Sequence, residues 1–219
     1  ERDQAPSLEY PDQVVIPHPV TARYQRLGRT ETTPPRILFL SRFHPVKGLD
    51  LLLNAAHLLR EKVPDFTLVL AGAGKPGYED RLRRRIQALS LTEKIEWAGF
   101  VEGDEKEKCL GEASVFVLPS RQESFGMAVV EAMDAGLPVV VSRGVGIWRE
   151  VEEAEAGLAV DRDPKALAEA LTRLLEDDEL RKGLGENGRE LVRTQFSLEE
   201  IGPRLRHLYR SIAADRRTA

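Results

Sequence analysis

The sequence predicts an α/β fold: a doubly wound, Rossmann-like parallel sheet of about six strands, with helices on both faces and a C-terminal helical extension. Its strand-length apolar runs, such as 115–118 and 139–142, are continuous rather than alternating, so both faces of the sheet must be covered. Segments with helical periodicity separate these runs along the chain, which is the order of a doubly wound domain. After residue 178 no strand pattern follows, and two arginine-rich helices are expected instead.

The expected strands are short apolar segments bounded by polar, glycine or proline residues. They cover residues 36–41, 67–71, 95–97, 115–118, 139–142 and 157–160, and 14–16 is a further candidate. Helices are expected at residues 47–62, 78–89, 104–111, 125–135 and 164–176, then at 178–194 and 197–213. This pattern divides the chain into a polar linker at 1–13, one domain at 14–177 and the helical extension at 178–219.

Composition excludes several classes of protein. Of 219 residues, 42% are hydrophobic, which is too many for a disordered chain and enough for a sizeable core. No apolar run approaches the roughly 18 residues of a membrane span. The net charge of −4 argues against a nucleic-acid partner bound by phosphate neutralisation. The lone Cys109 and four scattered histidines predict no disulfide, no metal site and a reducing, cytoplasmic location.

A ligand site is expected in the strand-to-helix loops, because ligands bind at the carboxyl ends of the strands in such sheets. Residues 72–77 follow one strand and formally match the glycine fingerprint of dinucleotide-binding domains. Pro76 removes one amide from this loop, and Glu96 lies inside the next strand instead of at its end. A glycine turn that allows close packing is the favoured interpretation. A nicotinamide-dinucleotide-binding oxidoreductase domain is the alternative function.

A second loop places Arg42 at a strand end and Lys47 at the following helix start. The helix dipole disfavours a cation there and favours an anion. The two side chains would form a two-point clamp for an anion and stabilise a departing phosphate. The alternatives are two solvated surface cations, or a pair between Lys47 and Asp50 in the same turn.

A third segment, residues 120–133, combines a loop with the start of a helix. Ser124 suits a helix N-cap, and free amides around residues 125–128 would attract phosphate. Glu123 precedes the helix, and Glu131 lies about two turns further on, in an otherwise apolar run where an unpaired carboxylate is costly if buried. A ribose or sugar diol would supply its hydrogen bonds. The alternative is that Glu131 and Asp134 share a solvated face.

Together these segments resemble the C-terminal half of the retaining glycosyltransferases of family four, which have the GT-B fold. The resemblance runs from about residue 14 to the helix at 164–176. Any single element is weak, but all of them occur in order: Ser41-Arg42, Lys47-Gly48-Leu-Asp50, Gly72-Ala-Gly74, residues 97–101, residues 113–120, and Glu123-Ser-Phe-Gly126 leading to Glu131. The two glutamates are eight positions apart, as in the family's paired-glutamate motif. The sequence departs from the family at His18-Pro19 and at residues 144–150.

The resemblance implies a hexosyltransferase that moves a sugar from a UDP or GDP sugar with retention of configuration and no bound metal. Arg42, Lys47 and Glu123 would be its catalytic residues: the two cations bind the diphosphate and stabilise the leaving nucleotide, and Glu123 contacts the sugar. Glu131 would bind the ribose. Further donor contacts are expected from Ser124, Phe125, Gly126, Met127, Ala128, Gly72, Gly74, Phe100, Val101 and His44.

The resemblance also implies partners beyond the nucleotide-sugar donor. Family members carry an N-terminal acceptor domain, for which this chain has no room, and the chain begins at Glu1 without a methionine. We therefore expect an excised donor domain that binds nucleotide but does not turn over. Residues 178–219 would pack on the absent domain. The parent enzyme is expected in the cytoplasm, with peripheral association at the inner face of the membrane.

Overall fold

The computed structural model describes residues 16–21 and 23–218, and within them six parallel strands form one sheet. The strands are β1 (Arg36–Leu40), β2 (Thr67–Ala71), β3 (Ile95–Gly99), β4 (Val115–Leu118), β5 (Val139–Ser142) and β6 (Gly157–Val160). Their spatial order is β3-β2-β1-β4-β5-β6, and every neighbouring pair is parallel. The order therefore reverses between β1 and β4, and a crevice opens at their carboxyl ends. The predicted fold class is confirmed.

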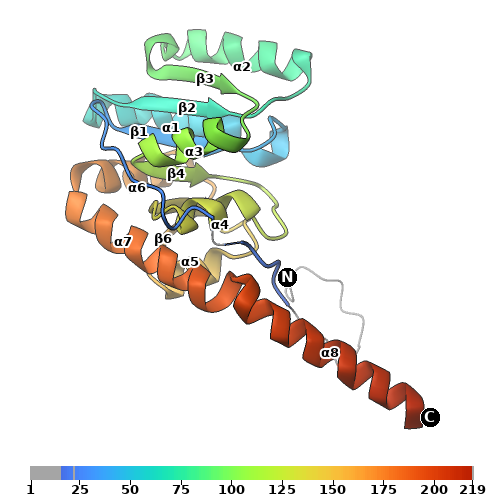
Figure 1. Cartoon of the computed structure of the whole chain (residues 1–219). Coiled ribbons are helices and arrows are strands. Elements are labelled where there is room, and N and C mark those ends of the chain that lie inside the picture. The colour runs from blue at the N-terminus through green and yellow to red at the C-terminus, as the bar shows by residue number, and fades with distance from the viewer. Residues whose placement is uncertain (1–15, 22, 219) are drawn as a thin grey trace.

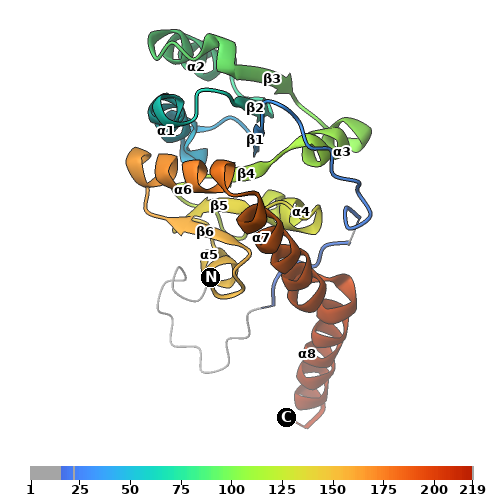
Figure 2. The same cartoon turned by 90° about the vertical axis from the view of Figure 1, so that its left-hand side faces the viewer.

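Helices cover both faces of the sheet, as the continuous apolar strands require. On one face lie α1 (Leu49–Lys62), α2 (Pro76–Ala88) and α6 (Pro164–Glu176), and on the other lie α3 (Gly103–Glu112), α4 (Met127–Asp134) and α7 (Asp178–Leu191) (Figures 1 and 2). The central strands are enclosed: every residue of β4 and β5 is buried. The sheet can therefore hold its loops in fixed positions at the crevice.

The strand boundaries agree closely with the prediction, whereas several helix starts differ. The helix expected at 47–62 begins at Leu49, after a 3₁₀ turn η1 (Pro45–Lys47). Likewise α4 begins at Met127 rather than at residue 125. In both cases a glycine in the left-handed region precedes the helix, a conformation that glycine adopts without steric cost. A short helix, α5 (Trp148–Glu153), forms where no helix was predicted.

The C-terminal extension is helical, as predicted. A π-helical turn η3 (Val192–Phe196) joins α7 to α8 (Leu198–Thr218), which projects away from the sheet (Figure 1). Tyr209 and Ile212 on α8 are exposed. None of the helices in the described part of the chain combines the length and apolar character needed to cross a bilayer. The strand candidate at 14–16 lies outside the described residues except for Ile16, which is not in a strand.

Candidate functional site

The crevice between β1 and β4 contains a cavity of about 300 Å³. Its wall is formed by the loop after β1, the loop after β4 and the first residues of α4, so it lies at the switch point of the sheet. Residues 123–128 of the third predicted segment line it. The lining residues are His18, Leu40, Ser41, Lys47, Leu118, Glu123, Ser124, Phe125, Gly126, Met127 and Ala128.

Close packing of two loops brings Lys47 into this cavity. Gly48 has φ +79°, and a Cβ there would lie 2.1 Å from the Pro119 carbonyl oxygen. The Arg121 amide donates to the Val46 carbonyl over 2.7 Å and joins the same loops. As a result, Lys47 Nζ forms an ion pair with the Glu123 carboxylate, and both side chains are mostly buried. The predicted cation and the first predicted glutamate therefore meet.

Asp50 is not the partner of Lys47, so that interpretation is wrong. Its carboxylate instead accepts from Arg81 on α2 over 3.0 Å. The reason is geometric: Asp50 lies in α1, beyond the left-handed Gly48. It faces α2, which covers the same face of the sheet as α1. Lys47, before Gly48, is directed toward the crevice.

The backbone of Glu123 is fixed from the opposite side by the loop after β5. The Glu123 amide donates to the Gly144 carbonyl over 2.9 Å, and the Gly146 amide donates to the Glu123 carbonyl over 2.7 Å. A Cβ at Gly146 would lie 2.0 Å from the Ser124 carbonyl oxygen. The glycines of the loop after β5 thus allow the close approach that holds Glu123 in place.

The N-terminus of α4 opens into the cavity without a side-chain cap. The prediction that Ser124 caps this helix is wrong: the N-cap is Gly126, with φ +96°, and no side chain bonds to the helix start. The first amides of a helix have no partner within it, and Met127 and Ala128 at this position line the cavity. These amides and the helix dipole favour an anion in the cavity.

Glu131 lies one helical turn beyond Met127 and Ala128 on α4. Its Oε1 accepts from Lys106 Nζ of α3 over 2.6 Å. Asp134 does not share a solvated face with it, so that alternative is wrong. Asp134 is 1% exposed, and its Oδ2 accepts from the Tyr24 amide over 2.7 Å. The segment before β1 packs over α4 and buries Asp134, which the local sequence does not indicate.

Burial raises the pKa of the Asp134 carboxyl above its ordinary value, against the opposing effect of the Tyr24 amide. The ionised form is therefore disfavoured in the folded state, and its cost is present at neutral pH and disappears below the ordinary pKa of an aspartate, about 4. We expect Asp134→Asn, whose amide oxygen can still accept from Tyr24, to raise Tm at pH 7 by about 2–4 °C. The gain should shrink toward pH 4. Thermal melts from pH 4 to 8 test this, and a gain independent of pH would contradict it.

Arg42 and His44 belong to the same loop as Lys47 but do not line the cavity. Arg42 is exposed and, within the described part of the chain, forms no ion pair or hydrogen bond. His44 caps η1: its Nδ1 accepts from the Val46 amide over 3.3 Å. Of the two cations in the predicted clamp, Lys47 lines the cavity and Arg42 does not. The role of Arg42 in binding the diphosphate stays a prediction.

The glycines of the fingerprint loop serve packing. The Gly72 amide donates to the Gly99 carbonyl, and the Gly74 amide donates to Glu79 over 2.7 Å. A Cβ at Gly72 would lie 1.9 Å from the Ser41 carbonyl oxygen, and one at Gly74 2.5 Å from that of Phe43. These contacts support the favoured interpretation of a close-packing turn. Neither glycine lines the cavity, so their donor contacts stay predictions.

The loop that follows β3 lies outside the cavity wall. Phe100 is 70% exposed, whereas Val101 is buried. An exposed aromatic ring in a strand-to-helix loop is compatible with a base lying on it, and the role of this loop stays a prediction.

Sequence reasoning missed His18 and Lys106. His18 lines the cavity, with its ring centroid 6.0 Å from that of Phe125. His18 contacts Phe125, and Lys106 contacts Glu131, across long separations in the sequence. No local pattern could therefore have indicated these two residues.

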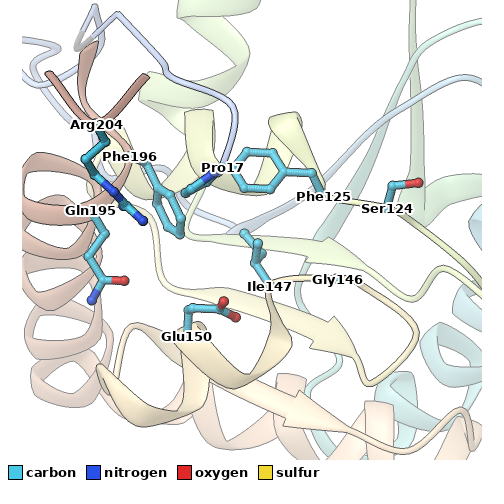
Figure 3. Close-up of a pocket in the computed structure, with 9 residues that line it drawn as sticks. All are labelled: Pro17, Ser124, Phe125, Gly146, Ile147, Glu150, Gln195, Phe196 and Arg204. Atoms are coloured by element: carbon cyan, nitrogen blue, oxygen red, sulfur yellow. The ribbon is translucent and has the colours of Figure 1, made fainter. Parts of the chain in front are cut away.

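A second cavity shares part of its wall with the first. Ser124 and Phe125 line a second cavity of about 270 Å³ (Figure 3). The Phe125 ring packs edge-to-face on Phe196, with centroids 5.5 Å apart. Figure 3 shows Glu150 and Arg204 at the more polar side of this cavity. The aromatic contact anchors the loop that carries Glu123.

Among residues 16–21 and 23–218, no three His, Cys, Asp or Glu side chains are grouped as ligands for a metal ion. Lys47 and the free amides at the N-terminus of α4 place positive charge at the cavity. Such groups can bind and stabilise a phosphate oxyanion directly.

Comparison with known proteins identifies the family of this chain. Residues 23–191 match the family model described as glycosyl transferases group 1. The chain is 35% identical over 198 residues to the phosphatidyl-myo-inositol mannosyltransferase of Mycobacterium leprae, covering 89% of this chain and 50% of that protein. It is 31% identical over 202 residues to a GDP-mannose-dependent monoacylated alpha-(1-6)-phosphatidylinositol monomannoside mannosyltransferase of Corynebacterium glutamicum, covering 89% and 52%.

Solved structures that resemble this chain are also glycosyltransferases. Sucrose-phosphate synthase from Thermosynechococcus elongatus superposes with a TM-score of 0.79 at 29% identity, over 91% of this chain and 52% of that one. The C-terminal domain of a glycosyl transferase group 1 family protein from Francisella tularensis gives 0.67 at 25% identity, over 83% and 96%. The chain spans about half the length of the full-length relatives named here. The chain belongs to the glycosyl transferases group 1 family and has the Rossmann-like architecture of a GT-B glycosyltransferase domain.

Proposed function

We propose that this chain is the donor-binding half of a glycosyltransferase that transfers a hexose from a nucleoside-diphosphate sugar with retention of configuration. The observation that carries the proposal is the meeting of Lys47, Glu123 and the uncapped start of α4 in one cavity at the switch point. Lys47 and the amides of Met127 and Ala128 bind the diphosphate. Their positive charge then stabilises the nucleoside diphosphate as it departs.

The two glutamates bind the uncharged parts of the donor. Glu123, at the cavity wall, accepts hydrogen bonds from hydroxyls of the sugar, and Glu131 accepts from the ribose. Arg42 adds a second cation from the exposed loop. The charge on the leaving group is balanced by these protein groups in the proposal, which therefore includes no metal ion.

We propose that the acceptor is bound by a part of the parent enzyme outside this chain. We propose an N-terminal acceptor domain in the parent enzyme, with residues 178–219 packed on it. The exposed Tyr209 and Ile212 of α8 support this packing. The isolated chain then binds nucleotide without turnover. The Mycobacterium leprae relative is named for phosphatidyl-myo-inositol, and we propose a cytoplasmic parent enzyme that associates peripherally with the inner face of the membrane.

Nicotinamide-dinucleotide binding is not favoured. That function needs free amides in the glycine loop to hold a pyrophosphate. In this chain the Gly72 and Gly74 amides already donate to protein acceptors.

Isothermal titration of the isolated chain with UDP, GDP, ADP and NAD tests the proposal. We expect at least one of the three nucleoside diphosphates to bind in the micromolar range and NAD to bind more weakly. Absence of heat with all three diphosphates would contradict donor binding. Tight binding of NAD alone would favour the oxidoreductase alternative.

The ion pair between Lys47 and Glu123 predicts an unusual effect of one substitution. The diphosphate must compete with the Glu123 carboxylate for Lys47, and the same carboxylate repels the phosphates. We expect Glu123→Gln to tighten binding of the nucleoside diphosphate by roughly three- to tenfold. The gain for the full nucleotide sugar should be smaller, because the sugar loses a charged acceptor.

Titration calorimetry with both ligands measures the two gains. Glu61→Gln, which removes an exposed carboxylate from α1, is the matched control and should leave both affinities unchanged. Weaker diphosphate binding by Glu123→Gln would show that Glu123 does not compete for Lys47.

A further inference from the structure

We propose that Lys106 is a positioning residue for nucleotide binding: it holds the Glu131 carboxylate against the ribose and makes the site selective for ribose over 2′-deoxyribose. This inference rests on the proposed function, because it takes Glu131 as the ribose contact. It adds a residue of α3, a helix that contains no part of the diphosphate site.

Two helices that start at the carboxyl ends of the strands bring Lys106 and Glu131 together. α3 follows β3, and α4 follows β4, so both begin at the carboxyl ends of strands. Met127 and Ala128 line the cavity, and Glu131 lies three to four positions further along, on the same side of α4. Lys106 Nζ reaches Glu131 Oε1 from α3 over 2.6 Å. The pair therefore lies one helical turn beyond the diphosphate-binding amides.

The pair is mostly buried, which makes the lysine important for the position of the glutamate. The Lys106 and Glu131 side chains are 20% and 22% exposed, and the Tyr24 ring lies 5.9 Å from Lys106 Nζ. A carboxylate in such surroundings is costly without a counter-charge. Without Lys106, Glu131 gains by turning toward solvent and away from the nucleotide.

The hydrogen bonds leave one carboxylate oxygen for a ligand. Lys106 occupies Oε1, and within the described part of the chain Oε2 of Glu131 has no hydrogen-bond partner. A carboxylate only accepts hydrogen bonds, and the 2′,3′-diol of a ribose offers two hydroxyl donors. A 2′-deoxyribose offers one. Fixing Glu131 therefore stabilises a bound ribonucleotide more than its deoxy counterpart.

The test compares a nucleoside diphosphate with its 2′-deoxy analogue by titration calorimetry of the full chain, using whichever of UDP, GDP and ADP binds most tightly. We expect the wild-type chain to prefer the ribonucleotide by about tenfold, the value of one hydrogen bond to a charged group. Lys106→Met should weaken the ribonucleotide roughly five- to tenfold and the deoxynucleotide less than twofold. Lys106→Arg should restore the preference, since it keeps the cation.

Three further variants make the result specific. Lys108→Met removes a cation from the same helix whose side chain is 73% exposed, and it should leave the preference for ribose unchanged. In a Glu131→Gln background, Lys106→Met should cause no further loss of preference. Lys106→Gln serves as the second neutral variant if Lys106→Met fails to fold.

Each result that contradicts the prediction identifies which part of the proposal is wrong. Equal weakening of both nucleotides by Lys106→Met, or no weakening of either, would overturn the positioning role. A wild-type chain that binds diphosphates but does not distinguish ribose from deoxyribose would overturn this inference alone. A wild-type chain that binds none of the three diphosphates would overturn the proposed function with it.

Discussion

Replacing Lys47 with alanine is expected to weaken binding of the nucleoside diphosphate by roughly 30- to 100-fold, which corresponds to about 2–3 kcal/mol. The reason is that Lys47 contributes an ammonium group to the cavity wall, and hydrogen bonds between ammonium and phosphate are charge-assisted. The free nucleoside carries no phosphate, so its affinity should change by less than twofold. The ratio of the two losses measures the phosphate contact itself.

Calorimetry of the wild-type and variant chains with the diphosphate and the nucleoside gives this ratio. Lys62→Ala is the matched control: it removes the same charge from the exposed last turn of α1, at the opposite edge of the sheet. It should change the diphosphate affinity by no more than about twofold from the wild-type value. The reason is that solvent and salt screen an exposed charge at the far end of α1. Equal losses of diphosphate and nucleoside in the Lys47 variant would contradict a phosphate role for this lysine.

Most of the fold follows from the sequence because its signals are local. A buried parallel strand must be apolar on both faces, and the apolar runs at 115–118 and 139–141 lie in β4 and β5. Pro164 likewise marks the observed first residue of α6. Helix starts after a left-handed glycine are harder to predict, because Gly48 and Gly126 are fixed by contacts with distant loops.

The site is less predictable because its partners come from separate segments. The order of residues in the chain indicates that Lys47 and Glu123 follow strands, and the sheet order then brings them together. Nothing near Asp134 in the sequence shows that the segment containing Tyr24 covers it. For the same reason Lys106 carries no signal of its pairing with Glu131. Predictions from single positions fail where tertiary packing selects the partner.

The substitution Gly48→Ala is expected to lower the free energy of unfolding by about 3 kcal/mol, within a range of about 2–5 kcal/mol. Alanine at φ +79° costs about 1–2 kcal/mol in backbone strain, and its Cβ would lie 2.1 Å from the backbone oxygen of Pro119. That atom cannot rotate away, so the loops after β1 and β4 must separate, with a further cost of about 1–3 kcal/mol. The expected fall in Tm is roughly 6–12 °C.

Urea unfolding and thermal melts measure this loss. Gly77→Ala is the matched control, because Gly77 lies in α2 without a positive φ and a Cβ there meets nothing within 4 Å. It should leave stability unchanged or raise it slightly, since alanine is the better helix former. Separation of the loops also moves Lys47 away from the start of α4 at the cavity, so the folded Gly48→Ala chain should bind the diphosphate more weakly than wild type. Full stability and full affinity in this variant would show that the close approach of Gly48 to Pro119 does not position Lys47.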